Sequence, residues 1–118
     1  MAQRSTVEPS AWNEFLADFS ERNNGRRARF ELFGQGGSVK EESQEGHFEK
    51  ASLTGRTVTV VRTYESHGET KTMADEIRDT HGIQIQHDAE GGEETLEFMN
   101  HNGDKTVLRF ESLIDGAS

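Results

Sequence analysis

Apolar and polar residues alternate on both sides of an Asn-Gly dipeptide near the end of the chain, which predicts a β-hairpin. A two-residue loop at Asn102-Gly103 would divide the large apolar side chains between the two faces of the hairpin. A three-residue loop over 101–103 places them on one face and needs φ > 0 at Gly103. We therefore predict a buried face and a solvated face that carries Glu97, Lys105 and Arg109. The predicted cross-strand partners are Leu96 with Leu108, Phe98 with Thr106, and Glu94 with Phe110.

One segment near the start of the chain has helical periodicity. Trp12, Phe15, Leu16 and Phe19 recur at i, i+3, i+4 and i+7, which forms one apolar stripe. Pro9 suits a first helical turn, Ser10 or Glu8 can cap it, and Asn23-Asn24-Gly25 is a typical left-handed end. We interpret Trp12, Phe15 and Phe19 as core residues that lie on a sheet; the alternative is a dock for a second subunit.

The rest of the chain predicts strands separated by short turns. Residues 70–80 also fit a helical turn through Met73, Ala74 and Ile77, but strand is favoured, while 38–45 is either an exposed loop or a poorly buried edge strand. His81-Gly82 is expected to turn into the strand 83–87. The other expected strands are 26–33, 48–53 and 56–64, where Val58, Val60 and Arg62 share one face.

These elements define an α+β fold, with one N-terminal amphipathic helix packed on a bent or nearly closed antiparallel β-meander of about six strands. We predict a loose N-terminal tail over residues 1–8, a single α+β domain over 9–112 and a C-terminal tail over 113–118. The chain has 118 residues, enough for one core, and only 23 of them are Leu, Ile, Val or Phe, so the core should be thin.

Composition excludes several classes of function. There is no cysteine, which rules out disulfides, thiolate metal sites and cysteine nucleophiles. No segment approaches a membrane span of about 18 apolar residues, and the N-terminus lacks the apolar core of a signal peptide, so we expect a cytoplasmic protein. The formal net charge of −9 disfavours binding to nucleic acid or to an anionic membrane. A monomer or a weak homo-oligomer is expected.

The charge balance also suggests adaptation to high salt. Acidic residues number 22 against 13 basic ones, and nine of the basic residues are arginine. Like-charge repulsion destabilises such a chain in low salt and is largely screened at about 1 M, where the Debye length is about 3 Å. The alternative interpretation is an ordinary acidic protein from a GC-rich genome.

No reactive constellation appears in the sequence, so no catalytic, cofactor-binding or metal-binding residue is predicted. The five histidines show neither the helical nor the strand spacing that aims two imidazoles at one ion, and His67, His81 and His101 each fall at expected turns. The sequence Asp79-Thr80-His81 is not expected to converge, because adjacent side chains alternate in direction. The glycine-rich run at 34–37 lacks the Lys-Ser/Thr pair of a phosphate loop and is interpreted as a hairpin connection.

Three of the nine arginines, Arg26, Arg27 and Arg29, lie within four positions after the helix. They could complement the negative end of the helix and nearby carboxylates. Guanidinium groups also bind carboxylate and phosphate bidentately, so these residues are the candidate site for an acidic protein segment or a small anionic ligand. Arg27 and Arg29 should face solvent if Ala28 and Phe30 are buried.

Two segments carry motifs that can be compared with known proteins. The first is Pro9-Ser10-Ala11-Trp12-Asn13-Glu14-Phe15, continuing to Phe19-Ser20 and Gly25, and the second is Leu96-Glu97 with the run from Asn102-Gly103 to Thr106-Val107-Leu108-Arg109-Phe110. They resemble the opening helix and the closing hairpin of a family of small bacterial proteins catalogued only as a domain of unknown function. The family tends to carry an aromatic residue after the glycine, where this chain has Arg26. The resemblance implies a self-contained helix-plus-sheet domain and no particular activity.

We therefore predict a non-catalytic module that binds a partner protein or a small anion and needs no cofactor. The alternative is a small-molecule-binding protein or minor enzyme with a pocket inside the bent sheet, roofed by the helix and lined by Phe30, Val60, Ile85 and Phe98. Solid packing at those four residues would favour the first hypothesis. A third possibility is an accessory protein with no ligand.

Overall fold

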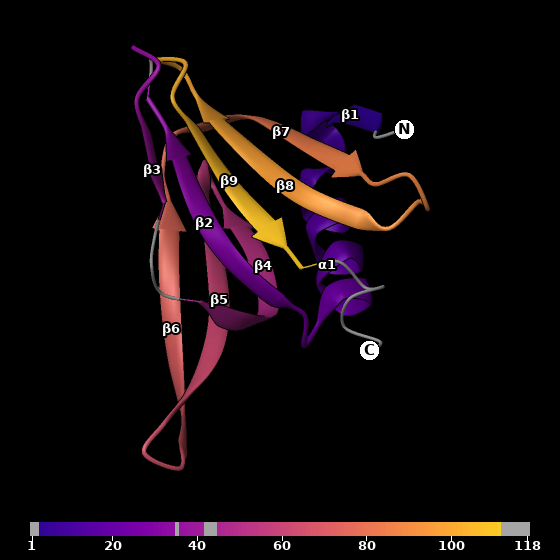
Figure 1. Ribbon diagram of the computed structural model, residues 1–118. Helices are drawn as coiled ribbons and strands as arrows, with labels where there is room; N and C mark the ends of the chain where they lie inside the picture. Colours follow the sequence, from indigo (N-terminus) through magenta and orange to yellow (C-terminus); the bar gives the residue numbers. More distant parts are fainter. Residues whose placement is uncertain (1–2, 35, 42–44, 112–118) are drawn as a thin grey trace.

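The computed structural model describes residues 3–34, 36–41 and 45–111, which form one helical segment and one antiparallel sheet (Figure 1). The α+β prediction is confirmed, although the described residues form nine strands rather than about six. The helical segment is a 3-10 turn, η1 (Pro9–Ala11), followed by α1 (Trp12–Asn23). The strands are β1 (Gln3–Val7), β2 (Arg27–Phe33), β3 (Val39–Glu41), β4 (Gly46–Thr54), β5 (Thr57–Ser66), β6 (Glu69–Ile77), β7 (Thr80–His87), β8 (Glu93–Asn100) and β9 (Lys105–Phe110).

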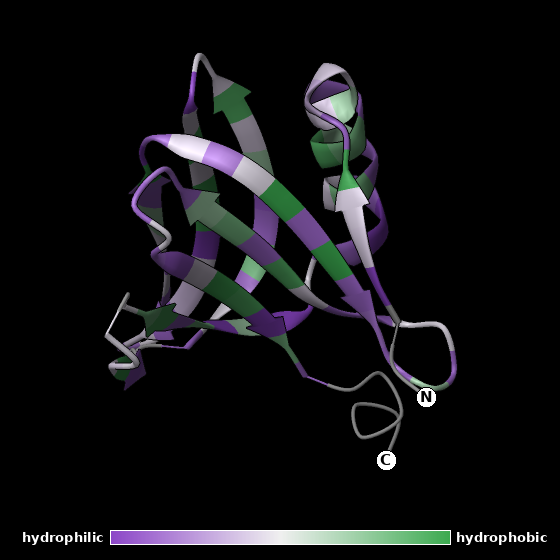
Figure 2. Ribbon diagram, turned by 90° about the horizontal axis from the view of Figure 1, so that it is seen from above, coloured by the Kyte–Doolittle hydropathy of each residue, from purple (hydrophilic) through white to green (hydrophobic). Residues whose placement is uncertain are grey.

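The sheet curls strongly but does not close into a barrel. Its strand order is β1-β7-β8-β9-β2-β4-β5-β6, with β3 paired to β2, and every pair is antiparallel. The first part of β2 pairs with β4 through Arg27 and Ala28, whereas its last residues pair with β3. The strands β4, β5 and β6 therefore diverge from β2, and Figures 1 and 2 show the resulting bend.

The predicted helical stripe is core. Trp12, Leu16 and Phe19 are buried, Phe15 is partly buried, and α1 packs chiefly against β4. The ring of Phe19 makes edge contacts with Phe48 and Phe110 at centroid distances of 5.6 and 5.5 Å. Glu8 precedes the 3-10 turn without a side-chain cap, and Gly25 ends the helical segment at φ +92° as expected. Of the described helices, none combines the length and the apolar character needed to cross a membrane.

The C-terminal hairpin has the predicted register. Leu96 lies opposite Leu108, Phe98 lies opposite Thr106, and Gly103 has φ +90°. The prediction of a fully solvated outer face is wrong, because Glu97 on that face is buried. Ion pairs from Arg4 and Lys105, at 3.1 and 3.2 Å, cover this carboxylate. Apolar and polar residues alternate along the strands, as Figure 2 shows.

The expectation of a loose tail over residues 1–8 is wrong for Gln3–Val7. This segment forms β1 and pairs with β7 from Gln3 opposite His87 to Val7 opposite Ile83. The Trp12 indole donates a hydrogen bond to the Val7 carbonyl at 3.0 Å, which fixes the end of the strand over the helix. Val7 is the one apolar residue among the five residues of β1, so the sequence of this strand shows no apolar alternation. The tail predicted over 113–118 lies outside the described residues.

The middle strands match the prediction except at one connection. Residues 69–77 form a strand, as favoured, and Val39–Glu41 form an exposed edge strand within 38–45. The glycine-rich run connects β2 to β3, with its Gln35 outside the described residues. The predicted turn at His81-Gly82 is wrong, because the chain turns at Arg78-Asp79 and β7 begins at Thr80. Asp79 has φ +58°, a left-handed conformation that Asp tolerates, so the turn needs no glycine.

Candidate functional site at the open side of the sheet

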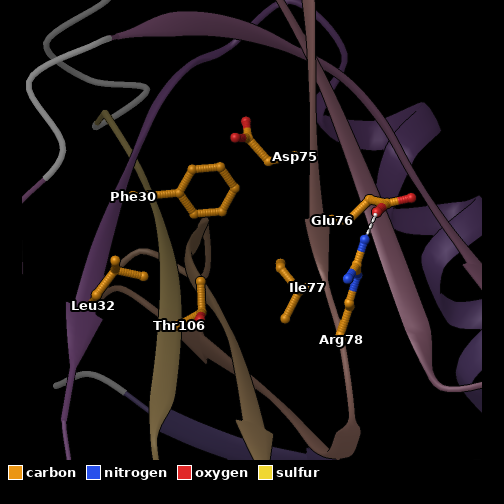
Figure 3. A pocket seen from close by; sticks show the side chains of 7 residues that line it. All are labelled: Phe30, Leu32, Asp75, Glu76, Ile77, Arg78 and Thr106. Carbon is orange, nitrogen blue, oxygen red and sulfur yellow. Dashed lines mark hydrogen bonds and ion pairs between the residues drawn. The ribbon is translucent and has the colours of Figure 1, made fainter.

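A groove lies where the curled sheet stays open, and we call it the open groove. Figure 3 shows Phe30 and Leu32 of β2 with Thr106 of β9 on one wall, and Asp75, Glu76 and Ile77 of β6 with Arg78 on the other. Its volume is about 270 Å³. Ile77 and Asp75 lie opposite the buried residues Val58 and Val60 of β5, so strand parity turns both side chains toward the interior.

A fully buried arginine lies behind this groove. Arg62 of β5 is 0% exposed, and it donates hydrogen bonds to the Ala28 carbonyl at 3.2 Å and to Asp75 Oδ2 at 3.1 Å. Its guanidinium carbon lies 4.6 Å from the centroid of the Phe30 ring. Asp75 is 39% exposed, so the carboxylate both neutralises a buried charge and presents an oxygen to the groove. The prediction that Arg62 shares a face with Val58 and Val60 is confirmed, since all three are buried, but Arg62 was not predicted as part of a site.

The walls of the open groove expose apolar surface. Leu32 is 39% exposed although it shares strand parity with the buried residues Ala28 and Phe30. At Leu32 the neighbours of β2 are β9 and the exposed three-residue strand β3, because β4 pairs with β2 only at Arg27 and Ala28. Leu32 and Val39 are the exposed large hydrophobic residues of the described chain, and Leu32 lines the groove.

The strand β6 is an edge of the sheet, and no described strand pairs with its outer side. It joins β5 through the two-residue turn His67-Gly68, with φ values of +52° and +78°. Such a turn closes on a hydrogen-bonded pair, here Ser66 and Glu69, and bonded and non-bonded pairs then alternate along the ladder. By this alternation Thr70, Thr72, Ala74 and Glu76 direct their backbone N–H and C=O groups away from β5. The register has no bulge over nine residue pairs, so the outer side of β6 is a regular template.

The three arginines predicted as an anion site do not converge. Arg26 is half-buried and donates to Asn23 Oδ1 at 2.8 Å and to the Glu93 carbonyl at 2.6 Å, while its guanidinium carbon lies 5.0 Å from the centroid of the Phe110 ring. Burial lowers the pKa of Arg26 from its ordinary value despite the attraction of Glu93. Arg26 thus ties the helix end to β8 and the core.

Arg27 and Arg29 are on the outer face of β2, as predicted. Arg27 pairs with Glu45 at 2.9 Å and with Glu111 at 3.7 Å, and Arg29 pairs with Glu31 at 3.8 Å. Their positive charges are therefore matched within the chain. In the structure Arg27 and Arg29 thus complement nearby carboxylates, which was one of the two roles considered for them.

A second group of polar side chains assembles where the β6–β7 connection meets the β8–β9 hairpin. Asp79 Oδ1 lies 2.9 Å from His81 Nε2, and Asp79 Oδ2 is hydrogen-bonded to His101 Nδ1. Asp79, Thr80 and His81 do not converge as a set of three, as expected, but the carboxylate of Asp79, which has φ +58°, does meet the imidazole of His81. The intervening Thr80 points inward and donates to the Ile77 carbonyl at 3.2 Å. The hydrogen bond from His101, reinforced by one from His81, lowers the pKa of the Asp79 carboxyl.

Two imidazole nitrogens and a carboxylate oxygen in this group lie within 4.8 Å of one another, a donor set that suits a transition metal. Spacing along one helix or strand does not reveal this group. His81 lies on β7 and His101 in the turn after β8, and the two meet because β7 pairs with β8.

No family model, curated protein or solved structure matches the chain. The resemblance to a bacterial family of unknown function therefore stays a prediction.

Proposed function

We propose that the protein is a non-catalytic module that binds an extended segment of a partner protein along β6. The observation that carries the proposal is a long, regular edge strand beside a groove with apolar walls. An added strand would accept and donate backbone hydrogen bonds at Thr72, Ala74 and Glu76, and its alternate side chains would enter the open groove. The backbone would provide affinity and the groove would provide selectivity.

The chemistry of the groove indicates the kind of segment. Phe30, Leu32 and Ile77 favour apolar side chains at every second position of the ligand. Asp75 is already paired with Arg62 and Glu76 with Arg78, at 3.1 and 2.9 Å, so the walls carry little unmatched charge. The net charge of −9 repels acidic partners at long range. The expected ligand is therefore an extended segment with alternating apolar residues and few acidic ones.

This proposal moves the binding surface away from Arg26, Arg27 and Arg29, whose guanidinium groups have acceptors within the chain. It keeps the interaction-module hypothesis, which solid packing inside the sheet was expected to favour. Phe30, Val60, Ile85 and Phe98 all lie in the buried cluster that contains the helix residues, although Phe30 also lines the open groove. The expected cytoplasmic location and the adaptation to high salt stay predictions.

A small molecule in the same groove is the second candidate. A buried ion pair whose carboxylate faces an apolar wall resembles the few placed polar groups of ligand pockets. The groove volume of about 270 Å³ lies just below the roughly 300–1,000 Å³ typical of such pockets, which favours the peptide.

Selection from a random-peptide library displayed on phage tests the proposal. Peptides that bind the wild-type chain should alternate apolar residues and should slow amide hydrogen exchange at Thr72, Ala74 and Glu76. Ala74→Pro removes an outward N–H without breaking a ladder bond to β5, so the variant should fold and lose binding. Ala74→Thr changes the side chain at the same position, keeps the N–H, and should retain binding. Equal binding by the two variants, or enrichment of peptides without alternation, would contradict strand addition.

A further inference from the structure

We infer that Asp79, His81 and His101 form a binding site for one divalent transition-metal ion, with Zn²⁺ the best match. Each of the three residues offers one ligand atom within 4.8 Å of the other two. Nε2 of His81 and Nδ1 of His101 are the nitrogens that contact the Asp79 carboxylate, so they are the candidate ligand atoms. This site shares no residue with the open groove and does not depend on the proposed function.

The donor set selects the class of ion. Zn²⁺ binds imidazole nitrogen and carboxylate oxygen at about 2.0–2.2 Å, whereas Mg²⁺ and Ca²⁺ prefer oxygen ligands alone. Ligand atoms around a tetrahedral Zn²⁺ are then about 3.3 Å apart, so atoms that now lie within 4.8 Å of one another have to approach by at most about 1.5 Å. Three protein ligands leave the remaining coordination position to water or to a side chain of a partner.

The hydrogen bonds within the group already bring the ligand atoms close to the positions that a metal ion would need. Asp79 now bridges the two imidazoles through hydrogen bonds, and a metal ion would occupy the place between the carboxylate and the ring nitrogens. The two rings are already inclined to each other by 61°, with centroids 5.7 Å apart. All three side chains are partly or largely exposed, so an ion can reach them from solvent.

The position of Asp79 depends on an unusual backbone conformation. Its φ of +58° lies in the left-handed region, which non-glycine residues adopt mainly when local contacts hold them there. This conformation reverses the chain between β6 and β7 and brings the carboxylate between the imidazoles of His81 on β7 and His101 in the β8–β9 turn. An ion would link this connection to the β8–β9 hairpin.

Arg56 opposes metal binding and supplies a second test. Its Nη1 lies 3.5 Å from His81 Nδ1, the ring nitrogen opposite the proposed ligand atom. When His81 Nε2 binds a metal, Nδ1 carries the proton and faces the guanidinium N–H groups, and the two positive charges also repel each other. Replacement of Arg56 by Gln removes the charge and offers a carbonyl oxygen to the Nδ1 proton. Arg56→Gln should therefore bind Zn²⁺ more tightly than the wild-type chain.

Isothermal titration of the full chain with ZnCl₂ tests the inference, with MgCl₂ and CaCl₂ as comparisons. We expect one Zn²⁺ per chain, no comparable binding of Mg²⁺ or Ca²⁺, and a Co²⁺ complex with visible d–d absorption. Asp79→Asn and His101→Gln should each weaken Zn²⁺ binding at least about tenfold. Residues that only hydrogen-bond to a metal ligand already cost about 10–100-fold in metal affinity when they are replaced, so loss of a ligand itself should cost no less. Asn tolerates the left-handed conformation, so Asp79→Asn should fold.

His67→Asn is the matched control, because His67, like His101, is an exposed turn histidine but lies outside the group, and Asn tolerates its φ of +52°. It should bind Zn²⁺ like the wild-type chain. The inference fails if the wild-type chain binds no Zn²⁺, if His101→Gln binds as well as the wild type, or if His67→Asn weakens binding to the same extent. It also fails if Arg56→Gln weakens binding while its thermal stability is unchanged.

Discussion

Removal of Asp75 should destabilise the fold more than removal of Arg62, although Asp75 is the more exposed partner of the pair. Asp75→Ala leaves the guanidinium of a fully buried arginine without its carboxylate. Arg62→Met replaces that charge with an apolar side chain and leaves a carboxylate that water can solvate, since Asp75 is 39% exposed. The asymmetry follows from burial, because the cost of an unmatched charge depends on its access to water.

The contacts give approximate magnitudes. Breaking a buried ion pair by removal of one partner costs about 3–5 kcal/mol, and the partial exposure of Asp75 places Asp75→Ala near 3 kcal/mol. Arg62→Met loses the hydrogen bond to the Ala28 carbonyl and should cost about 1 kcal/mol. When Arg62 is already Met, Asp75→Ala leaves no buried charge without a counter-ion. The free energy of unfolding of the double variant should therefore also fall by only about 1 kcal/mol.

Urea unfolding followed by the fluorescence of Trp12, the single tryptophan, measures all four states of this cycle. At about 4 °C per kcal/mol for a domain of this size, Asp75→Ala should lower the melting temperature by about 12 °C and Arg62→Met by about 4 °C. Asp75→Asn keeps an oxygen acceptor and should fall between them. Additive effects in the double variant, or a larger loss for Arg62→Met than for Asp75→Ala, would refute the argument.

Three further predictions concern pH, salt and the hairpin turn. Burial raises the pKa of Glu93, but hydrogen bonds from Arg22 and Asn23 outweigh it and the net pKa is lowered below its ordinary value of 4.5. The resulting stability is present above that value and lost as pH falls through the depressed pKa, so Glu93→Gln should flatten acid unfolding followed by circular dichroism. The melting temperature should rise between low and molar KCl because repulsion among the acidic residues is screened; no rise would contradict salt adaptation. Gly103→Ala should cost about 1–2 kcal/mol in thermal unfolding because Gly103 has φ +90°, whereas Gly36→Ala, with no atom within 4 Å of its new Cβ, should be near neutral.

The parts of the fold that the sequence predicted are those specified by local periodicity. The stripe from Trp12 to Phe19 defines both the helix and its buried face, and the alternation around Gly103 is sufficient to select a hairpin register. β1 escaped prediction because its pairing with β7 joins segments that are about 80 residues apart, and its sequence has no apolar alternation. The burial of Glu97 was not predicted for a related reason, since Arg4, which pairs with its carboxylate, lies on β1.

The candidate sites depend on how the sheet bends. For this reason Arg26, Arg27 and Arg29, which are close in sequence, do not form the single anion site that was predicted. Arg26 precedes β2 and points to the helix end, whereas Arg27 and Arg29 lie on the outer face of β2. The three side chains therefore lie in two different environments. Asp79 and His101 are 22 positions apart and meet because β7 pairs with β8. A chain with 22 acidic residues contains many carboxylates near basic groups, so only the arrangement in space separates a site from a solvated surface. The inward parity of Arg62 was the one local signal, because a charge on the buried face of a strand requires a partner.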